Sequence, residues 1–333
     1  MYAIVCVVLE KYSRAICFYV IRKDYRMSEV AKKINKFLHN PATRFACMER
    51  LGLFDRMTDE QYLKLKYKSI FGKELNLDNP QTFNEKLQWL KLHNRKPEYT
   101  IMVDKYLSKQ YVADKIGAEY VVPLLGVWDD PDEIDFDALP DQFVLKCNHN
   151  SGVGMCICKD KSKLDIKKVR EELRNGLKED YYLKSREWPY KNVPRKIIAE
   201  QYLLENRIEG REECLTDYKF FCFDGKPKVA YISKDNALHP TTDFFDMEFD
   251  RLDLKMKDPP SECPPQKPAE FDEMKKIAEV LSCDVPHLRV DFYDISGKLY
   301  VGELTFYHNG GFGRVSPEKW DKTLGDWIKI PGG

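Results

Sequence analysis

Two carboxylates near the end of the chain have the spacing of a cation site. Asp291 and Glu303 flank a turn expected at Ser296–Gly297, and pairing of the flanking stretches as a hairpin places both carboxylates on one face. Carboxylates whose Cβ atoms lie about 5 Å apart repel each other unless a cation lies between them. Mg²⁺, which takes carboxylate oxygens together with substrate phosphates, meets this need. Arg289 shares the face, so pairing of the arginine with both acids is the alternative.

A lysine ahead of a glycine-bearing turn has the pattern of a phosphate grip. Lys146 ends an expected strand, and the turn that follows carries Ser151, Gly152 and Gly154. The lysine would supply a point charge, and the backbone N–H groups of the turn would surround the phosphate oxygens. No Gly-Lys-Ser/Thr closes the turn, so it is not a Walker loop. An ordinary hairpin with an exposed lysine is the alternative.

Other side chains that could contact a substrate lie in less specific sequence patterns. Arg186 and Trp188 precede an expected strand and could contact an anionic or sugar acceptor, although packing explains them equally well. His308 opens the glycine-rich stretch after the hairpin, which makes it a candidate for an acceptor loop; a satisfied histidine in a simple loop is the alternative. Lys105 lies in a helical stretch and predicts nothing alone, because solvated lysines are common on helices.

Helical signals come first among the elements that must position these groups. Thr58 and Thr82 each open a capping box, in which the residue three places on returns the hydrogen bond. Gly72 is placed to end the first of these helices. A third helix is expected over 101–115, with Gly117 as its end.

Strand signals follow, in runs of β-branched and aromatic residues. Strands are expected over 121–127, 143–147, 154–158 and 197–203. Hairpins are expected over 218–233 and 289–306, turning at Asp224–Gly225 and Ser296–Gly297. Helices are expected over 164–178, 270–281 and after Pro317. The expected fold class is α+β, a helical N-terminal region followed by mixed or antiparallel sheets.

The bulk composition fits a globular chain with more than one lobe. The 333 residues are 43% hydrophobic and 13% aromatic, which excludes wholesale disorder. Basic and acidic residues both number 54, so no basic stripe argues for a nucleic-acid partner. Most of the ten cysteines stand singly in apolar stretches, and the close pair Cys156 and Cys158 matches no common zinc spacing. Reduced thiols in a cytoplasmic protein are therefore expected.

The first forty residues admit two interpretations. Their apolar run is interrupted by Glu10, Lys11 and Arg14, so it matches neither a spanning helix nor a signal peptide. A basic helix is expected after Met27, and it could contact a membrane surface from the cytoplasmic side. The other interpretation is that the native chain starts at Met27, or that residues 1–40 are a loosely packed extension.

Taken in order, these pieces resemble the ATP-grasp superfamily, whose best-known members are the D-alanine–D-alanine ligases. The shared features are an Asp-Lys pair opening a helix, a strand lysine before a Gly/Ser loop, an acidic hinge strand and an Arg-x-Asp…Glu hairpin. The hinge in this chain is Ile198–Leu203. The resemblance covers about residues 100 to 330 and implies two α+β lobes that grip ATP.

Four stretches resemble the TupA-like branch of that superfamily more closely. They are Asn79–Trp89, Lys146–His149, Asp217–Lys219 and Gly302–Phe306. The branch is named for teichuronopeptide biosynthesis and is associated with cell-surface polysaccharide loci. Each motif alone is weak, whereas their order and spacing together are specific.

The resemblance implies a role for each matching residue. ATP would be bound by Lys105, Lys146, Ser151, Gly152, Gly154, Glu200, Gln201, Tyr202 and Leu203. Asp217 and Lys219 would contact ribose, phosphate or substrate, with Lys219 also taking part in catalysis. Arg289 would stabilise the transferring phosphoryl group, and Asp291 and Glu303 would bind Mg²⁺.

One position departs from the family pattern. In many ATP-grasp ligases an Asn stands two positions after the metal-binding Glu. In this chain that position is Thr305. Thr305 would offer only a hydroxyl, or Asn309 would substitute for it, so the third metal ligand stays open.

The implied reaction is attack of a carboxylate on the γ-phosphate of ATP, followed by attack of an amine on the acyl phosphate.

The expected function is therefore an ATP-dependent carboxylate–amine ligase with Mg²⁺, attaching an amino acid or similar group in cell-surface polysaccharide biosynthesis. A glycosyltransferase is the first alternative, but Asp135–Asp137, an Asp-x-Asp motif, lies in an acidic loop with no α/β half ahead of it. A non-catalytic ATP-grasp-like binding protein is the second alternative. The residues name neither the acid nor the amine, and the oligomeric state stays open.

The resemblance also implies domain boundaries. Residues 1–40 would be an extension, and 41–125 a helical region ahead of the ATP-grasp core. Residues 126–199 would form the lobe with the phosphate loop, and 200–333 the lobe with the metal site.

Overall fold

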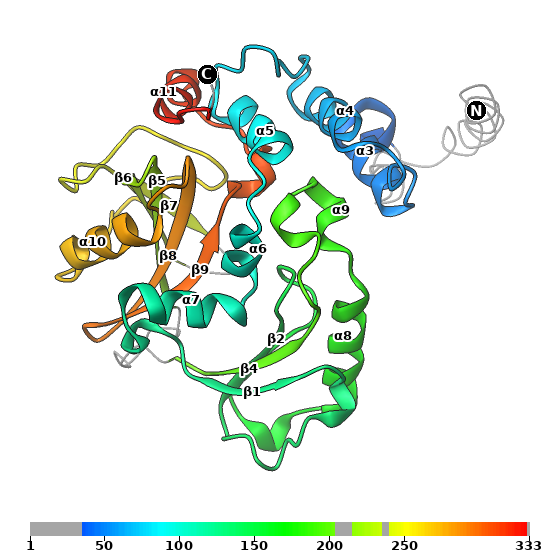
Figure 1. Cartoon of the computed structure of the whole chain (residues 1–333), viewed down its shortest axis with the longest axis vertical. Coiled ribbons are helices and arrows are strands. Elements are labelled where there is room, and N and C mark those ends of the chain that lie inside the picture. Colours follow the sequence, from blue (N-terminus) through cyan, green and yellow to red (C-terminus); the bar gives the residue numbers. More distant parts are fainter. Residues whose placement is uncertain (1–34, 204–214, 235–239, 332–333) are drawn as a thin grey trace, which may run out of the picture. The chain divides into compact units, whose positions relative to one another are not determined.

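The structure, a computed structural model, describes residues 35–203, 215–234 and 240–331 (Figure 1). The chain divides into two compact units, Met1–Phe54 and Asp55–Gly333. In the first unit, helix α3 (Pro41–Arg50) begins at Asn40, whose side chain accepts from the N–H of Thr43. The prediction of a basic helix after Met27 concerns residues that lie mostly outside the described ranges. No helix within those ranges has the length and apolar character needed to span a membrane.

The second unit opens with two helices that the capping boxes predict. Helices α4 (Asp59–Phe71) and α5 (Phe83–His93) begin at Thr58 and Thr82, and both reciprocal hydrogen bonds of each box are present. Helix α4 ends at Gly72, which has a φ of 73°. Glycine adopts this left-handed conformation without the steric cost of a side chain, which is why it commonly ends helices. Both predictions are confirmed.

The single helix predicted over 101–115 is wrong, because the chain forms two short helices there. These are α6 (Glu98–Val103) and α7 (Leu107–Ile116), the second ending at Gly117 as predicted. The carboxylate of Asp104 accepts from the N–H groups of Tyr106 at 2.8 Å and Leu107 at 3.3 Å, and so caps the start of α7. The break leaves Lys105 between the helices.

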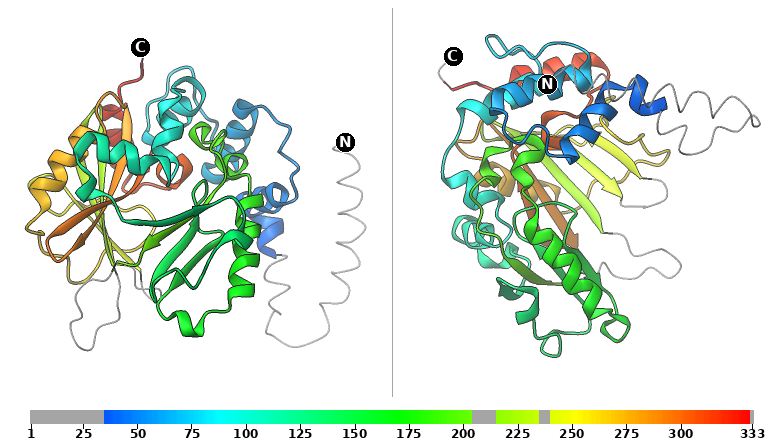
Figure 2. Two further views of the ribbon diagram at one scale, coloured as in Figure 1. Left: turned by 60° about the horizontal axis from the view of Figure 1, so that its bottom comes forward. Right: turned by 90° about the vertical axis from the view of Figure 1, so that its right-hand side faces the viewer.

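The smaller sheet has four antiparallel strands in the order β1-β4-β2-β3. Its strands are β1 (Leu124–Trp128), β2 (Phe143–Cys147), β3 (Met155–Cys158) and β4 (Ile197–Gln201). Helix α8 (Ile166–Lys178) covers one face, where Leu173 packs in a cluster with Leu145 and Ala199 (Figure 2). Because side chains alternate along a strand, Lys146 and Glu200 point to the opposite face.

A contact between two glycines fixes the loop between β2 and β3 against α8. A Cβ added to Gly176 of α8 would lie 2.6 Å from the Cα of Gly154. The side chains of Asn150 and His149 also contact the carbonyls of Gly176 and Glu179, each at 3.1 Å. Carbonyls at the end of a helix lack partners within the helix, so the loop satisfies them.

The larger sheet has five antiparallel strands in the order β7-β6-β5-β8-β9. Its strands are β5 (Thr216–Phe223), β6 (Lys226–Lys234), β7 (Thr241–Phe245), β8 (His287–Ile295) and β9 (Lys298–Thr305). Both predicted hairpins are confirmed, with positive φ at Asp224–Gly225 and Ser296–Gly297. Strand β7 was not predicted.

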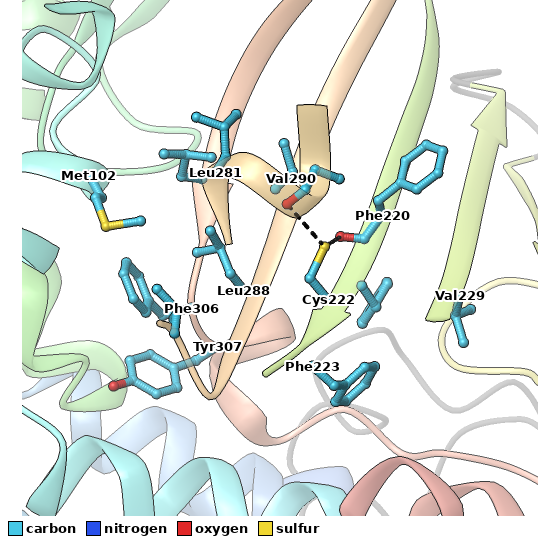
Figure 3. Packing of buried hydrophobic residues seen from close by; sticks show 14 of the residues in the cluster. Met102, Phe220, Cys222, Phe223, Val229, Leu281, Leu288, Val290, Phe306 and Tyr307 are labelled. Carbon is cyan, nitrogen blue, oxygen red and sulfur yellow. Dashed lines mark hydrogen bonds between the residues drawn. The ribbon is translucent and has the colours of Figure 1, made fainter. Parts of the chain in front are cut away.

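One face of the larger sheet packs on helix α10 (Phe271–Leu281) and holds the main core. The rings of Phe220 and Phe271 lie 5.2 Å apart, and the thiol of Cys222 contacts the carbonyl of Ala278 at 3.8 Å. Figure 3 shows Cys222 among other buried residues of this core, including Leu288 and Val290 of β8.

The other face of β5 changes character along the strand. Phe223 lies 5.3 Å from the ring of Trp327 in α11 (Glu318–Trp327), and Phe221 lies 6.5 Å from Phe83 of α5. Lys219 and Asp217 come next on the same face, since every second residue of a strand points the same way. Half of this face is therefore core, and the other half is charged.

Short elements complete the described part. They are α9 (Tyr181–Ser185) and the 3₁₀ turns η1 (Ala118–Tyr120), η2 (Pro131–Glu133), η3 (Lys161–Lys163), η4 (Trp188–Tyr190) and η5 (His308–Gly311). The cysteines of the described ranges are free thiols, as predicted. Cys147, Cys158 and Cys222 are buried, whereas Cys263 and Cys283 are exposed.

The glycine contact predicts an unusual response to alanine. Alanine is normally the better helix former by about 1 kcal/mol. We nevertheless expect Gly176→Ala to lower the free energy of unfolding by about 2 kcal/mol, because the added methyl group would overlap the backbone of Gly154. Urea denaturation measures the change. Asn175→Ala, at an exposed position of the same helix, is the control and should be neutral or slightly stabilising. Equal or greater stability of Gly176→Ala would contradict the proposed overlap.

Candidate functional site

Charged side chains gather in two groups within the second unit. The lysine group consists of Lys105, Lys109 and Lys146 around Glu200. The arginine group consists of Arg289, Lys219, Asp217, Asp291 and Glu303 on the charged half of the larger sheet. Lys105 connects them, because its Nζ donates to the carbonyl of Asn150 at 2.7 Å and lies 3.6 Å from Oε1 of Glu303.

Glu200 is the centre of the lysine group. Its two carboxylate oxygens lie 2.7 Å from Nζ of Lys109 and 2.5 Å from Nζ of Lys146. Burial opposes ionisation, but the two ammonium groups outweigh burial and hold the pKa of Glu200 below its ordinary value. The carboxylate therefore joins helix α7 to strands β2 and β4. Lys109 was not predicted as a site residue, although it lies four residues after Lys105.

Lys105 is positioned by a buried amide. The Nδ2 group of Asn148 donates to Asp104 and to the carbonyl of Pro194, both at 2.8 Å, and its Oδ1 accepts from the N–H of Lys196 at 2.7 Å. The carbonyl of Asn148 accepts from the N–H of Lys105 at 3.2 Å. Two motifs of the sequence, Asp-Lys and Lys-Cys-Asn-His, are thus one hydrogen-bonded unit.

In the arginine group, the register of β8 and β9 confirms that Asp291 lies directly opposite Glu303. Arg289 binds Asp291 through two parallel hydrogen bonds, both of 2.6 Å, and lies 3.8 Å from Glu303. Lys219 lies 3.2 Å from Asp291 and 2.8 Å from Asp217. Burial raises the pKa of Asp291, but Arg289 and Lys219 outweigh it and keep that pKa below the usual range. The cations and carboxylates of this face therefore alternate.

Arg289 has two further partners. Its Nη2 donates to the hydroxyl of Thr305 at 3.0 Å, and its Nη1 donates to Nδ1 of His308 at 2.7 Å. Burial and the guanidinium hold the pKa of His308 far below its ordinary value, so the ring is neutral and Nδ1 is an acceptor. The side-chain amide of Asn309 lies 3.0 Å from the other ring nitrogen, Nε2. His308, predicted as a substrate contact, therefore faces Arg289.

The carboxylate pair fits a hard divalent cation. Mg²⁺ is usually held by one or two carboxylates together with substrate phosphates, so a third acidic ligand is not required. No group of three His, Cys, Asp or Glu suited to a metal occurs among the described residues. Oδ1 of Asp291 accepts one hydrogen bond and keeps a second lone pair, and Glu303 is half-exposed. Thr305 is beside the pair and engaged with Arg289.

The remaining predicted residues lie at three places. Ser151 and Gly152 form the exposed tip of the β2–β3 loop. Gln201, Tyr202 and Leu203 line a cavity of 1060 Å³ at the end of β4, a volume sufficient for a nucleotide base and sugar. The guanidinium of Arg186 lies 4.7 Å from the ring of Tyr62, beside α4 rather than among the charged groups, and Trp188 is half-buried in η4.

Sequence reasoning missed Glu187, which lies between Arg186 and Trp188. It is 5% exposed, and a Cβ added to Gly310 would lie 3.4 Å from its Oε1. Burial raises the pKa of Glu187 to about 7.

The Asp-x-Asp motif lies in a different environment. Asp135 and Asp137 are exposed, and the carboxylate of Asp135 accepts from the N–H of Asp137 at 3.0 Å. That motif is a turn.

Comparison with known proteins gives one family match. A family model described as TupA-like ATPgrasp matches residues 85–329. No protein of curated function matches the chain.

Several solved structures are similar at low identity. The D-alanine–D-alanine ligase from Helicobacter pylori is 14% identical with a TM-score of 0.44, over 75% of this chain and 70% of that one. The Bacillus anthracis D-alanine–D-alanine ligase complexed with ATP is 17% identical with a TM-score of 0.37, over 62% of this chain and 54% of that one. The ATP-grasp ligase PsnB complexed with minimal precursor is 11% identical with a TM-score of 0.35, over 68% of this chain and 61% of that one.

The position of Glu200 predicts a pH-dependent loss of stability on mutation. Glu200→Gln leaves Lys109 and Lys146 without their shared carboxylate, which should cost about 3 kcal/mol at pH 7. Because the pKa of Glu200 is lowered on folding, its contribution exists above the unfolded pKa of about 4.3 and disappears as the pH falls through the folded value. The difference between wild type and variant, measured by urea denaturation, should therefore shrink below about pH 4.

The control is Glu171→Gln on the exposed side of α8, which should change stability little at any pH. A loss in Glu200→Gln that is equally large at pH 3 and pH 7 would show that packing, not charge pairing, explains the cost.

Proposed function

The chain belongs to the TupA-like ATP-grasp family, and from this membership we propose that it is an ATP-dependent ligase that joins a carboxylate to an amine. The predicted ATP-grasp fold is confirmed by the family match over residues 85–329. The observation that carries the proposal is the bridging position of Lys105, which contacts the β2–β3 loop and lies 3.6 Å from Glu303. One lysine thus connects the phosphate-binding elements with the carboxylate pair.

In the proposed complex, the lysine group binds the phosphates of ATP. Lys105 and Lys146 supply positive charge, and Ser151, Gly152 and Gly154 close the loop over the phosphate oxygens. Gln201, Tyr202 and Leu203 at the 1060 Å³ cavity contact the adenine base, and Glu200 holds Lys146 in place. Asp217 binds ribose or substrate.

The arginine group would act on the transferred phosphoryl group. Mg²⁺ at Asp291 and Glu303, with Thr305 or Asn309 as a further ligand, would neutralise phosphate charge. Arg289 and Lys219 stabilise the negative charge that develops on the equatorial oxygens. Their positions are fixed by Asp291 and His308, so little reorganisation is needed at the moment of reaction.

The proposed reaction has two steps. A carboxylate oxygen attacks the γ-phosphorus, the bond to the bridging oxygen breaks, and ADP leaves with that electron pair. An amine nitrogen then attacks the acyl carbon, phosphate leaves with the electrons of the C–O bond, and the amine proton passes to phosphate or water. Closure of the β2–β3 loop would exclude water from the acyl phosphate.

The four motifs shared with the TupA-like branch support a substrate in cell-surface polysaccharide biosynthesis, with an amino acid or similar group as one partner. Trp188 and Arg186 remain proposed acceptor contacts. Use of ATP and the free cysteines support a cytoplasmic location, with residues 1–40 as the proposed contact to the inner face of the membrane.

Nucleotide binding is the first test. We expect Mg-ATP to raise the thermal unfolding temperature of the wild type, because a ligand at about a hundredfold its Kd stabilises by about 2.7 kcal/mol. Lys146→Ala should abolish the rise, since it removes a phosphate contact and the partner of Glu200. Lys226→Ala, an exposed lysine at the start of β6, is the matched control and should keep it.

The same assay distinguishes the proposed ligase from the alternative, a glycosyltransferase. Stabilisation by Mg-UDP-sugars alone, unchanged in Lys146→Ala, would exclude the ligase and favour a glycosyltransferase. Stabilisation by Mg-ATP that depends on Lys146 justifies a search for carboxylate–amine pairs that release ADP.

A further inference from the structure

Helix α5 has three polar side chains on a buried face. Asn84, Gln88 and Lys91 are four and three residues apart, which places them on one side of the helix. We call these three residues the donor ridge. Their exposed fractions are 2%, 0% and 0%. Buried polar groups of this kind are costly unless they have hydrogen-bond partners, so the partners of the ridge determine what it holds in place.

The partners of the donor ridge are backbone carbonyls of residues 308–313, here called the glycine loop. Asn84 donates to the carbonyl of Gly313 at 2.9 Å. Gln88 donates to that of Gly311 at 2.6 Å, and Lys91 donates to that of Gly310 at 2.6 Å. The ridge residues therefore hold neighbouring peptide groups of one loop, more than two hundred residues away in the sequence, and Gln88 also donates to the carbonyl of Gly310 at 3.4 Å.

The backbone conformation of the glycine loop suits its residues but does not make the loop rigid. Asn309, Gly310 and Gly311 have φ values of 50°, 62° and 67°, three left-handed residues in succession. Asn and Gly adopt this region more readily than other residues, but glycine has many other conformations open to it, so contacts from outside the loop select this one. A Cβ on Gly311 would lie 2.4 Å from Nε2 of Gln88, so the loop and the ridge are in direct contact.

Lys91 is the most constrained member of the ridge. Besides Gly310, its ammonium donates to the carbonyl of Ser185 at 2.8 Å and to Oε1 of Gln88 at 2.9 Å. The ring of Phe312 lies 4.7 Å away. Burial lowers the pKa of Lys91, while the nearby carboxylate of Glu187 raises it. The ammonium therefore joins the glycine loop, the carbonyl of Ser185 and the side chain of Gln88 at one point.

The loop carries the ring that contacts Arg289. His308 lies directly before Asn309, and its Nδ1 accepts from Nη1 of Arg289 at 2.7 Å. The two hydrogen bonds to Asp291 engage Nε and Nη2 of Arg289, and Thr305 also accepts from Nη2. His308 accepts from the third nitrogen, Nη1, and so supports the planar guanidinium from its other edge. A shift of the loop would displace this support, and the loop is held by α5.

We propose that Gln88 and Lys91 are positioning residues, which orient Arg289 toward the terminal phosphoryl group of the nucleotide by holding the glycine loop and, through it, His308. The inference rests on the proposed function, in which Arg289 acts on the γ-phosphate. It gives a physical role to the Asn79–Trp89 motif, which has no direct contact with the charged groups in that function.

The test compares two nucleotides that differ only in the γ-phosphate. Calorimetry gives the Kd of Mg-ATP and of Mg-ADP for the wild type, Gln88→Met and Lys91→Met. Methionine is as long as glutamine and one atom shorter than lysine, and it has no hydrogen-bond donor. We expect the Kd of Mg-ATP to rise about tenfold in both variants and that of Mg-ADP to change less than about twofold. Should Lys91→Met fail to fold, Gln88→Met decides alone.

Lys86→Met is the matched control. Lys86 belongs to the same helix and donates to a backbone carbonyl outside the glycine loop, that of Ile328 at 2.9 Å. Its ratio of the two Kd values should equal that of the wild type. A purely structural role for the ridge predicts equal losses for both nucleotides, or a lower thermal stability with the ratio unchanged. Either result in folded variants would overturn the proposal.

A double variant supplies the second criterion. If the ridge acts through Arg289, adding Lys91→Met to Arg289→Ala should leave the Kd of Mg-ATP where Arg289→Ala alone puts it. Additive losses would refute the path through Arg289. A wild type that binds neither nucleotide contradicts the proposed function itself, whereas a wild type that binds both, with an unchanged ratio in the variants, contradicts only this inference.

Discussion

The requirement that buried charges be paired determines most of this site. Taking a carboxylate or an ammonium out of water costs several kcal/mol unless an opposite charge and good hydrogen bonds accompany it. Glu200 between Lys109 and Lys146 meets the requirement on one side, and Asp291 between Arg289 and Lys219 meets it on the other. Each pairing joins separate elements, so the same contacts that make the charges tolerable also fix α7 to the smaller sheet and β5 to β8.

Hydrogen bonds of side-chain amides and of Lys91 then fix the loops around the ion pairs. The amide of Asn148 orders the backbone on both sides of Lys105, and the glycine contact with α8 holds the loop that follows Lys146. On the larger sheet, the donor ridge of α5 gives the glycine loop its conformation. Directional bonds to backbone groups set geometry more strictly than ion pairs, because they depend on angle as well as distance.

The parts of the fold that the sequence predicted are those whose causes lie within a few residues. The capping boxes at Thr58 and Thr82 and the turn at Ser296–Gly297 are of this kind. The register that opposes Asp291 to Glu303 follows from that turn. The helix break at Asp104 was missed because the expected helix was continued through a residue whose side chain caps a new one. Lys109, Glu187 and the donor ridge could not be recognised, since the contacts that join Lys109 to Glu200, Glu187 to Gly310 and Lys91 to Gly310 span 90 residues or more.

The strand β5 bears on how such a protein can change over time. Its inward-facing aromatic residues, Phe221 and Phe223, belong to the core, while Lys219 and Asp217 of the same face belong to the charged half. Selection on the first pair acts through the amount of folded protein in the cell. In the proposed function, Lys219 and Asp217 act on the nucleotide or the substrate, and the ion pair of Lys219 with Asp291 also joins β5 to β8. A change at Phe221 or Phe223 therefore affects folding alone, whereas a change at Lys219 affects folding and turnover together.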